Sequence, residues 1–167
     1  MGKIISKKDG FTLLELTIVI AIVAFLAAIA IPAVAAYRDK ATFRRLASDL
    51  KTFGDAFKIY MISNDCYPPD SHDDAPYHLQ NGYGMEDYLP IDAWLGTPPW
   101  GGFYNWEGPD NYPYAGISLY GTTADDSMMT ELDKMMDDGD LTTGSFQKTS
   151  NGRYTYIVDD DPQPACN

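Results

Sequence analysis

The stretch FTLLELTIVIAIVAFLAAIAIPAVAA, residues 11–36, decides how this chain is built. Apart from Thr12, Glu15 and Thr17 every residue in it is apolar, and Leu16–Ala36 carry no charge. At about 1.5 Å per residue, a helix of this length spans the roughly 30 Å of hydrocarbon in a bilayer. The stretch therefore predicts a membrane-spanning helix.

The charges of the chain divide around this stretch. Lys3, Lys7 and Lys8 precede it, residues 37–60 hold six basic and three acidic side chains, and residues 61–167 hold three basic and nineteen acidic ones. The net charge of −12 argues against nucleic acid as a partner, because phosphate binding requires clustered Lys and Arg. The positive-inside rule places the lysines in the cytoplasm and the acidic C-terminal part outside, although basic residues also flank the far end of the stretch.

Two simple interpretations of this N-terminus stay open from the residues alone. Ala33-Val34-Ala35 offers a small-x-small site at which a secretory signal could be cut. The apolar run is longer than such signals need, however, and Glu15 has no purpose in one. A plain single-pass anchor also leaves Glu15 unexplained.

The block Gly10-Phe11-Thr12-Leu13-Leu14-Glu15 closely resembles the class III signal of type IV pilins and of the pseudopilins of type II secretion. In that family a prepilin peptidase cuts after the glycine, the new N-terminal residue is methylated, and a glutamate stands five residues into the mature chain. The resemblance assigns these roles to Gly10, Phe11 and Glu15. It continues to Pro32, which falls where the family often has a helix-loosening proline.

The resemblance also implies how the chain assembles. We expect a single-pass protein of the bacterial inner membrane with its head in the periplasm, which then polymerises with itself into a periplasmic or surface filament. The implied partners are the prepilin peptidase, an inner-membrane assembly platform and a cytoplasmic assembly ATPase. A lone carboxylate in hydrocarbon is costly unless paired, so Glu15 is expected to meet the Phe11 ammonium of a neighbouring subunit. Alternatively, Glu15 reaches the lipid headgroups.

Beyond the apolar stretch the sequence predicts an amphipathic continuation of the helix. Pro32 removes one backbone hydrogen bond, and we expect the helix to bend or loosen there. A stripe of apolar residues with spacings of three and four is predicted to pack against the head, with the basic residues facing outward. The stripe consists of Phe43, Leu46, Leu50, Phe53, Phe57 and Tyr60. Asn64 and Pro68-Pro69 are expected to end the helix.

The fold class predicted is α+β, with one long helix packed on a small antiparallel sheet, the pilin fold. Residues 1–10 are expected to be the leader, 11–36 the transmembrane and polymerisation helix, 37–64 the stalk and 65–167 the head. Residues 66–113 are predicted to be mostly loop with one short helical turn, and strands are expected at 114–120, 144–148 and 153–158. Between the first two strands we expect a helix with Thr123 as N-cap, which is lined by Met128, Leu132, Met135 and Met136.

The head also resembles the major pseudopilin of type II secretion in two places. Pro99-Trp100-Gly101 resembles a Pro-Trp-Gly turn of that family that leads into the sheet, and Ile117–Gly121 resembles a strand that ends in Ser-x-Gly. These matches favour a secretion pseudopilin over a surface pilus pilin. Pro98 stands where the family has Asp, and the helical insertion after Gly121 departs from its pattern.

Two cysteines agree with an exported head. A bond between Cys66 and Cys166 would enclose nearly all of it and could stabilise it by about 4–5 kcal/mol in the chain-entropy model. Two unpaired core thiols are the alternative.

Acidic residues around a glycine turn suggest a divalent cation. Calcium prefers hard oxygen ligands, and the major pseudopilins hold a calcium in the loop after the Ser-x-Gly strand. The candidate ligands are Asp125, Asp126, Asp137, Asp138 and Asp140. A solvated acidic turn is the alternative.

Nothing in the sequence predicts an enzyme. His72 and His78 lie in a polar loop without a metal-ligand spacing, and there is no phosphate loop, nucleophile elbow or Cys-x-x-Cys. Trp94, Trp100 and Trp106 could form a sugar-stacking surface of an adhesin, but core packing is the simpler interpretation. The function predicted is that of a filament subunit for protein export, with a surface pilus pilin or a membrane-anchored adhesin as alternatives.

Overall fold

The computed structural model describes residues 11–71 and 84–166, without the side chains of residues 35 and 36. Helix α1 spans Leu13–Asn64, and the head that follows contains the 3-10 helix η1 (Met85–Asp87) and the helices α3 (Ile91–Trp94) and α4 (Asp126–Met136). Its strands are β1 (Phe103–Glu107), β2 (Ala115–Tyr120), β3 (Phe146–Lys148) and β4 (Tyr154–Asp159). The predicted α+β class is confirmed. The chain divides into two compact units, Met1–Lys40 and Ala41–Asn167.

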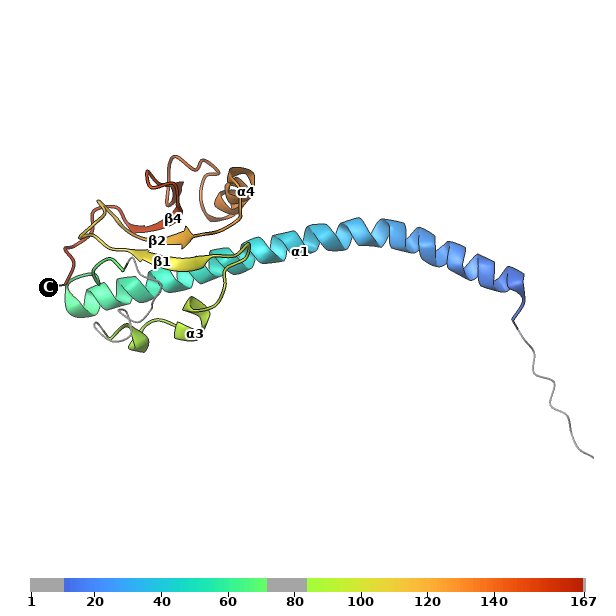
Figure 1. Cartoon of the computed structure of the whole chain (residues 1–167), viewed down its shortest axis with the longest axis horizontal. Helices are drawn as coiled ribbons and strands as arrows, with labels where there is room; N and C mark the ends of the chain where they lie inside the picture. The colour runs from blue at the N-terminus through green and yellow to red at the C-terminus, as the bar shows by residue number, and fades with distance from the viewer. Residues whose placement is uncertain (1–10, 72–83, 167) are drawn as a thin grey trace, which may run out of the picture. The chain divides into compact units, whose positions relative to one another are not determined.

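The four strands form one antiparallel sheet in the order β1-β2-β4-β3. In the second unit the sheet lies along one side of α1, and α3 lies on the opposite side of that helix (Figure 1). The head therefore holds α1 between the sheet and the segment that contains η1 and α3. This arrangement leaves one face of the helix uncovered.

The core lies where α1 meets these layers. Five members of the predicted stripe are buried, namely Leu46, Leu50, Phe53, Phe57 and Tyr60, while Phe43 is partly buried. Phe57 stacks on Trp106 of β1 at 3.7 Å between ring centroids, and Phe53 meets Tyr104 edge-on at 4.9 Å. Buried aromatic contacts of this kind dominate core energetics. The predicted end of the helix at Asn64 is also confirmed.

Most described residues of segment 66–113 lie outside helices and strands, as predicted, but the segment also contains a strand that was not predicted. Strand β1 lies in this segment, and its Tyr104 and Trp106 point to α1 while Asn105 and Glu107 occupy the other face. All four residues are buried, so the strand lacks the apolar-polar alternation that marks a half-exposed strand. Trp94 and Trp106 are core residues, and this position fits core packing rather than a sugar-stacking surface.

The predicted start of helix α4 is wrong by two residues. Asp125 is the N-cap, and its side chain accepts a hydrogen bond from the Met128 backbone N–H at 2.9 Å. The Thr123 hydroxyl instead donates to the Trp100 carbonyl at 2.8 Å. Met129 and Leu132 are the buried apolar residues of α4, whereas Met135 is exposed.

The turn before β1 requires glycine for a clear reason. Trp100, Gly101 and Gly102 all have positive φ angles, of 64°, 79° and 80°. A Cβ added to Gly102 would lie 2.2 Å from the Tyr120 carbonyl oxygen, whereas one added to Gly101 meets nothing within 4 Å. Gly102 therefore permits the close approach of the turn to the end of β2.

Candidate functional site

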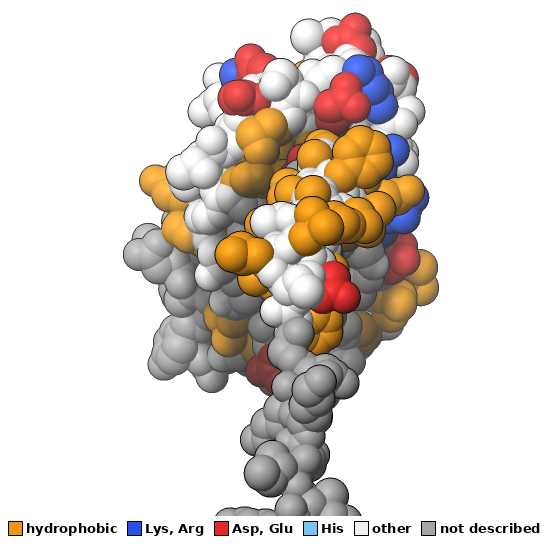
Figure 2. Space-filling view, turned by 90° about the vertical axis from the view of Figure 1, so that its right-hand side faces the viewer, with side chains coloured by type: hydrophobic (Ala, Val, Ile, Leu, Met, Phe, Trp, Pro, Cys, Tyr) orange, Lys and Arg blue, Asp and Glu red, His pale blue; other side chains and the backbone are white. Residues whose placement is uncertain are grey.

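The first candidate site is the N-terminal part of α1. Its apolar side chains are exposed around the whole helix, and the Phe11 side chain is 90% exposed. Among the described residues α1 is long and apolar enough to cross a bilayer. Hydrophobic side chains gather at the centre of Figure 2, which views the molecule from the side on which α1 begins. An all-apolar helix surface must be covered by lipid or by other subunits.

Glu15 forms a capping box with Thr12 at the start of α1. The backbone N–H and the hydroxyl of Thr12 both donate to Glu15 Oε2 at 2.8 Å, and the Glu15 N–H donates to Thr12 Oγ1 at 3.2 Å. Such reciprocal bonds satisfy donors that a helix start otherwise leaves free. The partners predicted for Glu15 are external, whereas the structure gives it an internal partner, Thr12. The Thr-x-x-Glu spacing in the sequence is the signal that could have identified Thr12 as the capping partner of Glu15.

The other predicted assembly residues are placed as follows. Pro32 lies inside α1, and the helix continues through it, so loosening at this position stays a prediction. Phe11 precedes the first helical residue. Gly10 and the leader lie outside the described residues.

Cys66 and Cys166 form a disulfide, as predicted, with their Cα atoms 5.2 Å apart. The adjoining backbone is paired as well. Tyr67 and Ala165 form a parallel bridge, in which the Cys166 N–H donates to the Tyr67 carbonyl at 2.7 Å. Ala165 and Cys166 are thus fixed beside the end of α1.

The acidic residues do not gather as one group. Asp133, Asp137 and Asp138 each offer an oxygen, and these atoms lie within 4.8 Å of one another. We call these three residues the Asp133 cluster. Asp133 was missed because it stands within the buried stripe of α4, but its spacing of four from Asp137 places both on one helical face.

The remaining predicted ligands have other partners. Asp125 caps α4, and Asp126 binds Lys148 Nζ at 2.6 Å and the Tyr154 hydroxyl at 2.5 Å. Asp140 accepts a hydrogen bond from the Thr142 hydroxyl at 2.7 Å. These residues shape α4 and its following loop.

Asp133 is electrostatically unusual. Its side chain is fully buried, and neither carboxylate oxygen has a hydrogen-bond partner. Burial, followed by the nearby charges of Asp138 and Asp137, raises the pKa of Asp133 to about 6. A buried carboxylate without a partner is costly when it is ionised. The Asp133 cluster therefore fits a hard divalent cation, which would neutralise this charge.

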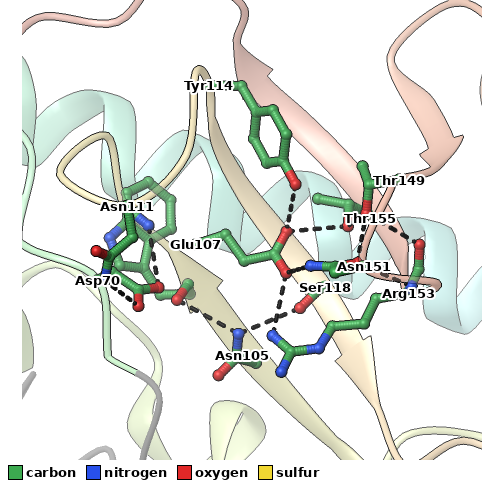
Figure 3. Close-up of polar contacts among 12 residues, drawn as sticks. Asp70, Asn105, Glu107, Asn111, Tyr114, Ser118, Thr149, Asn151, Arg153 and Thr155 are labelled. Atoms are coloured by element: carbon green, nitrogen blue, oxygen red, sulfur yellow. Dashed lines mark hydrogen bonds and ion pairs between the residues drawn. The ribbon is translucent and has the colours of Figure 1, made fainter.

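Another buried carboxylate, Glu107, is fully satisfied. Its carboxylate accepts hydrogen bonds from Tyr114, Asn151 and Thr155 at 2.8 to 3.1 Å (Figure 3). It also forms an ion pair with Arg153 at 3.1 Å. These groups come from the β1–β2 connection, from β4 and from the turn before β4. Burial raises the pKa of the Tyr114 hydroxyl, so it stays a donor. Glu107 holds strands together, which is a structural role.

The two histidines of the chain, His72 and His78, lie outside the described residues.

Comparison with known proteins decides among the alternatives. A family model of the prokaryotic N-terminal methylation motif matches residues 5–31. The type II secretion system core protein G of Klebsiella michiganensis is 32% identical over 115 residues, which cover 62% of this chain and 75% of that protein. The core protein G of Escherichia coli K12 is 31% identical over 134 residues, which cover 76% of this chain and 89% of that protein. The chain belongs to the family of type II secretion system core protein G.

As a member of this family, the chain is a pseudopilin, that is, a subunit of the type II secretion pseudopilus. The core protein G of Dickeya chrysanthemi, 25% identical over 158 residues, covers 87% of the chain, so the relationship extends over the head. The predicted resemblance to the major pseudopilin is confirmed. No solved structure matches the chain.

Proposed function

We propose that this pseudopilin is held in the bacterial inner membrane by residues 11–36, with its head in the periplasm, and then joins a fibre by its N-terminal helix. The observation that carries the proposal is the exposed apolar segment that begins within the N-terminal methylation motif. Residues 1–10 are the leader, residues 37–64 are the stalk, and residues 65–167 are the head. A prepilin peptidase, an inner-membrane platform and a cytoplasmic ATPase act on the chain in turn.

Glu15 exchanges partners during assembly. In the single subunit its carboxylate is held by Thr12, which keeps it ordered at the start of α1. Removal of the leader creates an ammonium at Phe11, and the Phe11 ammonium of a neighbour is a stronger partner than a neutral hydroxyl. A subunit at the wrong height leaves charges unpaired in an apolar environment. The carboxylate therefore aligns the subunits.

Calcium is proposed as the ligand of the Asp133 cluster. Asp133, Asp137 and Asp138 would hold it, and its charge would allow Asp133 to stay ionised inside the head. Asp137 and Asp138 also accept hydrogen bonds from Ser145 and Thr143, so the cation would order the loop between α4 and β3. This role is structural, and we propose no catalytic function for the head.

Mass spectrometry of the mature protein tests the membrane and fibre proposal. We expect an N-terminus at methylated Phe11. An intact Met1 would indicate a simple anchor, and a start at Ala36 or Tyr37 would indicate a secreted protein; both results contradict the proposal.

The Glu15→Ala variant tests the alignment role. We expect normal removal of the leader and a loss of fibres of at least tenfold, since the ammonium of the neighbour loses its partner. Electron microscopy of sheared fibres measures the yield, and Thr17→Ala, a polar deletion half a turn further along the helix, is the control. Normal fibre formation by Glu15→Ala would contradict the alignment role.

A further inference from the structure

A hollow lies on one side of α1 near the C-terminal end of the apolar segment. Ala30, Ile31 and Val34 form its apolar wall, and Arg38 and Asp39 lie at its C-terminal end. All five residues are exposed, and all belong to the first compact unit. We call this surface the Val34 hollow. Because Ala30, Val34 and Arg38 are spaced by four, they follow one side of the helix.

The Val34 hollow crosses the level at which the hydrocarbon of a bilayer ends. The uncharged stretch Leu16–Ala36 is about 31 Å long as a helix, which matches the thickness of the hydrocarbon core. With this stretch in the membrane, Val34 lies at the depth of the acyl chains, and Arg38 lies about 3 Å beyond Ala36 along the helix axis, among the headgroups. Tyr37, which is 74% exposed, lies at the interface, where tyrosine is enriched.

The apolar wall and the two charges therefore follow the same order as the parts of a phospholipid. An acyl chain can lie along Ile31 and Val34 while the headgroup of the same molecule reaches Arg38 and Asp39. A lipid in this position has one contact for each of its parts.

The two charges of the hollow select the headgroup. The Arg38 guanidinium presents a planar set of N–H donors that matches the oxygens of a phosphate. The Asp39 carboxylate repels a purely anionic headgroup, and it accepts hydrogen bonds but donates none. A headgroup with a phosphate and a primary ammonium satisfies both side chains, because the ammonium has three N–H donors. A quaternary ammonium lacks these donors.

Attraction of anionic lipid by the basic flank alone does not account for this surface. Arg38 and Lys40 both follow the apolar stretch, but Lys40 does not line the hollow. Asp39, which does line it, cancels the charge of Arg38. The hollow is thus complementary to a zwitterion and not to an anion.

We propose that the Val34 hollow binds one molecule of phosphatidylethanolamine, with its phosphate on Arg38, its ammonium on Asp39 and an acyl chain along Val34. The inference rests on the proposed function of residues 11–36 as a membrane segment, and it adds a specific lipid to that function. The bound lipid fixes the depth of the subunit in the membrane. It leaves the hollow when the helix leaves the bilayer for the fibre.

Native mass spectrometry of the full chain tests the headgroup preference. The chain is released from nanodiscs that contain equal parts of phosphatidylethanolamine and phosphatidylglycerol, or of phosphatidylcholine and phosphatidylglycerol. From the first mixture we expect one retained phosphatidylethanolamine per chain, at least fivefold more often than phosphatidylglycerol. From the second we expect no preference for phosphatidylcholine.

Charge variants of the full chain test the two headgroup contacts. Arg38→Gln and Asp39→Asn should each lower the retained phosphatidylethanolamine by at least fivefold. Lys40→Gln removes a neighbouring positive charge outside the hollow, and Asp55→Asn removes an exposed carboxylate of the second unit. Both controls should remain near wild type.

A matched pair of enlarged side chains tests the apolar wall without a change of charge. Ala30 lines the hollow, whereas Ala33, at a similar depth, does not. We expect Ala30→Leu to lower the retained phosphatidylethanolamine by at least fivefold and Ala33→Leu to leave it unchanged. Circular dichroism in the nanodiscs should show the same helix content for both.

Several results would overturn the inference. These are preferential retention of phosphatidylglycerol, equal retention of both lipids, release of the chain without lipid, or retention by Arg38→Gln and Asp39→Asn at the level of wild type. A lipid-free dimer would mean that a second copy occupies the hollow, which also overturns it. A wild-type chain that does not enter the nanodiscs would instead refute the membrane function of residues 11–36.

Discussion

At the scale of single residues, Gly102 and Gly101 provide a matched pair. Both have positive φ, but only a Cβ at Gly102 collides with backbone. We expect Gly101→Ala to lower the free energy of unfolding by about 1–2 kcal/mol and Gly102→Ala by at least about 3 kcal/mol. Urea unfolding of the full chain in detergent measures both. Equal effects would mean that the approach to Tyr120 is unimportant.

Asp133 is the residue on which the calcium proposal depends. At pH 7.5 we expect calcium at a hundredfold excess over its dissociation constant to stabilise the wild-type chain by about 2.7 kcal/mol relative to chelator. Asp133→Asn should lose this response and be more stable than wild type in chelator, because it buries no charge. Asp125→Asn, which keeps the helix cap, is the control.

Thermal unfolding with calcium and with chelator provides the measurement. If the wild-type melting temperature is the same in both, the calcium proposal is wrong. If Asp133→Asn responds like wild type, the cation binds elsewhere.

The sequence predicts single residues best where a pattern repeats. The stripe from Leu46 to Tyr60 was evident because each member recurs at helical spacing. Asp133 was not, because a carboxylate at a buried position becomes visible only when burial and neighbours are known. The sequence predicts Thr123 as the N-cap, because the contact that occupies its hydroxyl, with Trp100, depends on a turn more than twenty residues away and is invisible in the local pattern.

At the scale of elements, β1 was missed and the other strands were found. Strand β4 places Tyr154 and Tyr156 toward the core at alternate positions, which is a readable pattern. The polar residues of β1 are buried too, since Glu107 is surrounded by donors from β4 and from the turn before it. Such a strand is defined by its neighbours in the sheet more than by its own composition.

Helix α4 is attached to the sheet through Asp126. Its hydrogen bonds from Lys148 and then Tyr154 lower the pKa of Asp126 below the usual value of 3.8. A carboxylate with a lowered pKa in the folded state stabilises the fold above its unfolded pKa, and this contribution is lost as the pH falls through the folded value. We therefore expect Asp126→Asn to be less stable than wild type at pH 7, with a difference that shrinks below pH 3.8.

Urea midpoints of the two chains between pH 2 and pH 7 measure this difference. Asp92→Asn, which removes an exposed carboxylate that forms no ion pair within the described part of the chain, is the control and should follow wild type. A difference that is constant with pH would contradict the role of the Asp126 charge.

At the scale of the whole molecule, the disulfide closes a loop of about 100 residues. We expect Cys66→Ser/Cys166→Ser to lower the free energy of unfolding by about 4 kcal/mol, because the unfolded chain regains the freedom that the bond removes. Thermal unfolding of the full chain in detergent measures the loss. Dithiothreitol should bring the wild type to the level of the variant and leave the variant unchanged, and a variant as stable as the oxidised wild type would contradict the prediction.

The same bond has a mechanical consequence. Cys66 lies two residues beyond α1 and is bonded to Cys166, so residues 67–165 form a loop whose two ends are attached at one point. If a subunit is drawn from the membrane as proposed, tension along α1 is delivered to that point, and residues 67–165 are shielded from it. The head travels as a load on the helix and is not stretched by the pull.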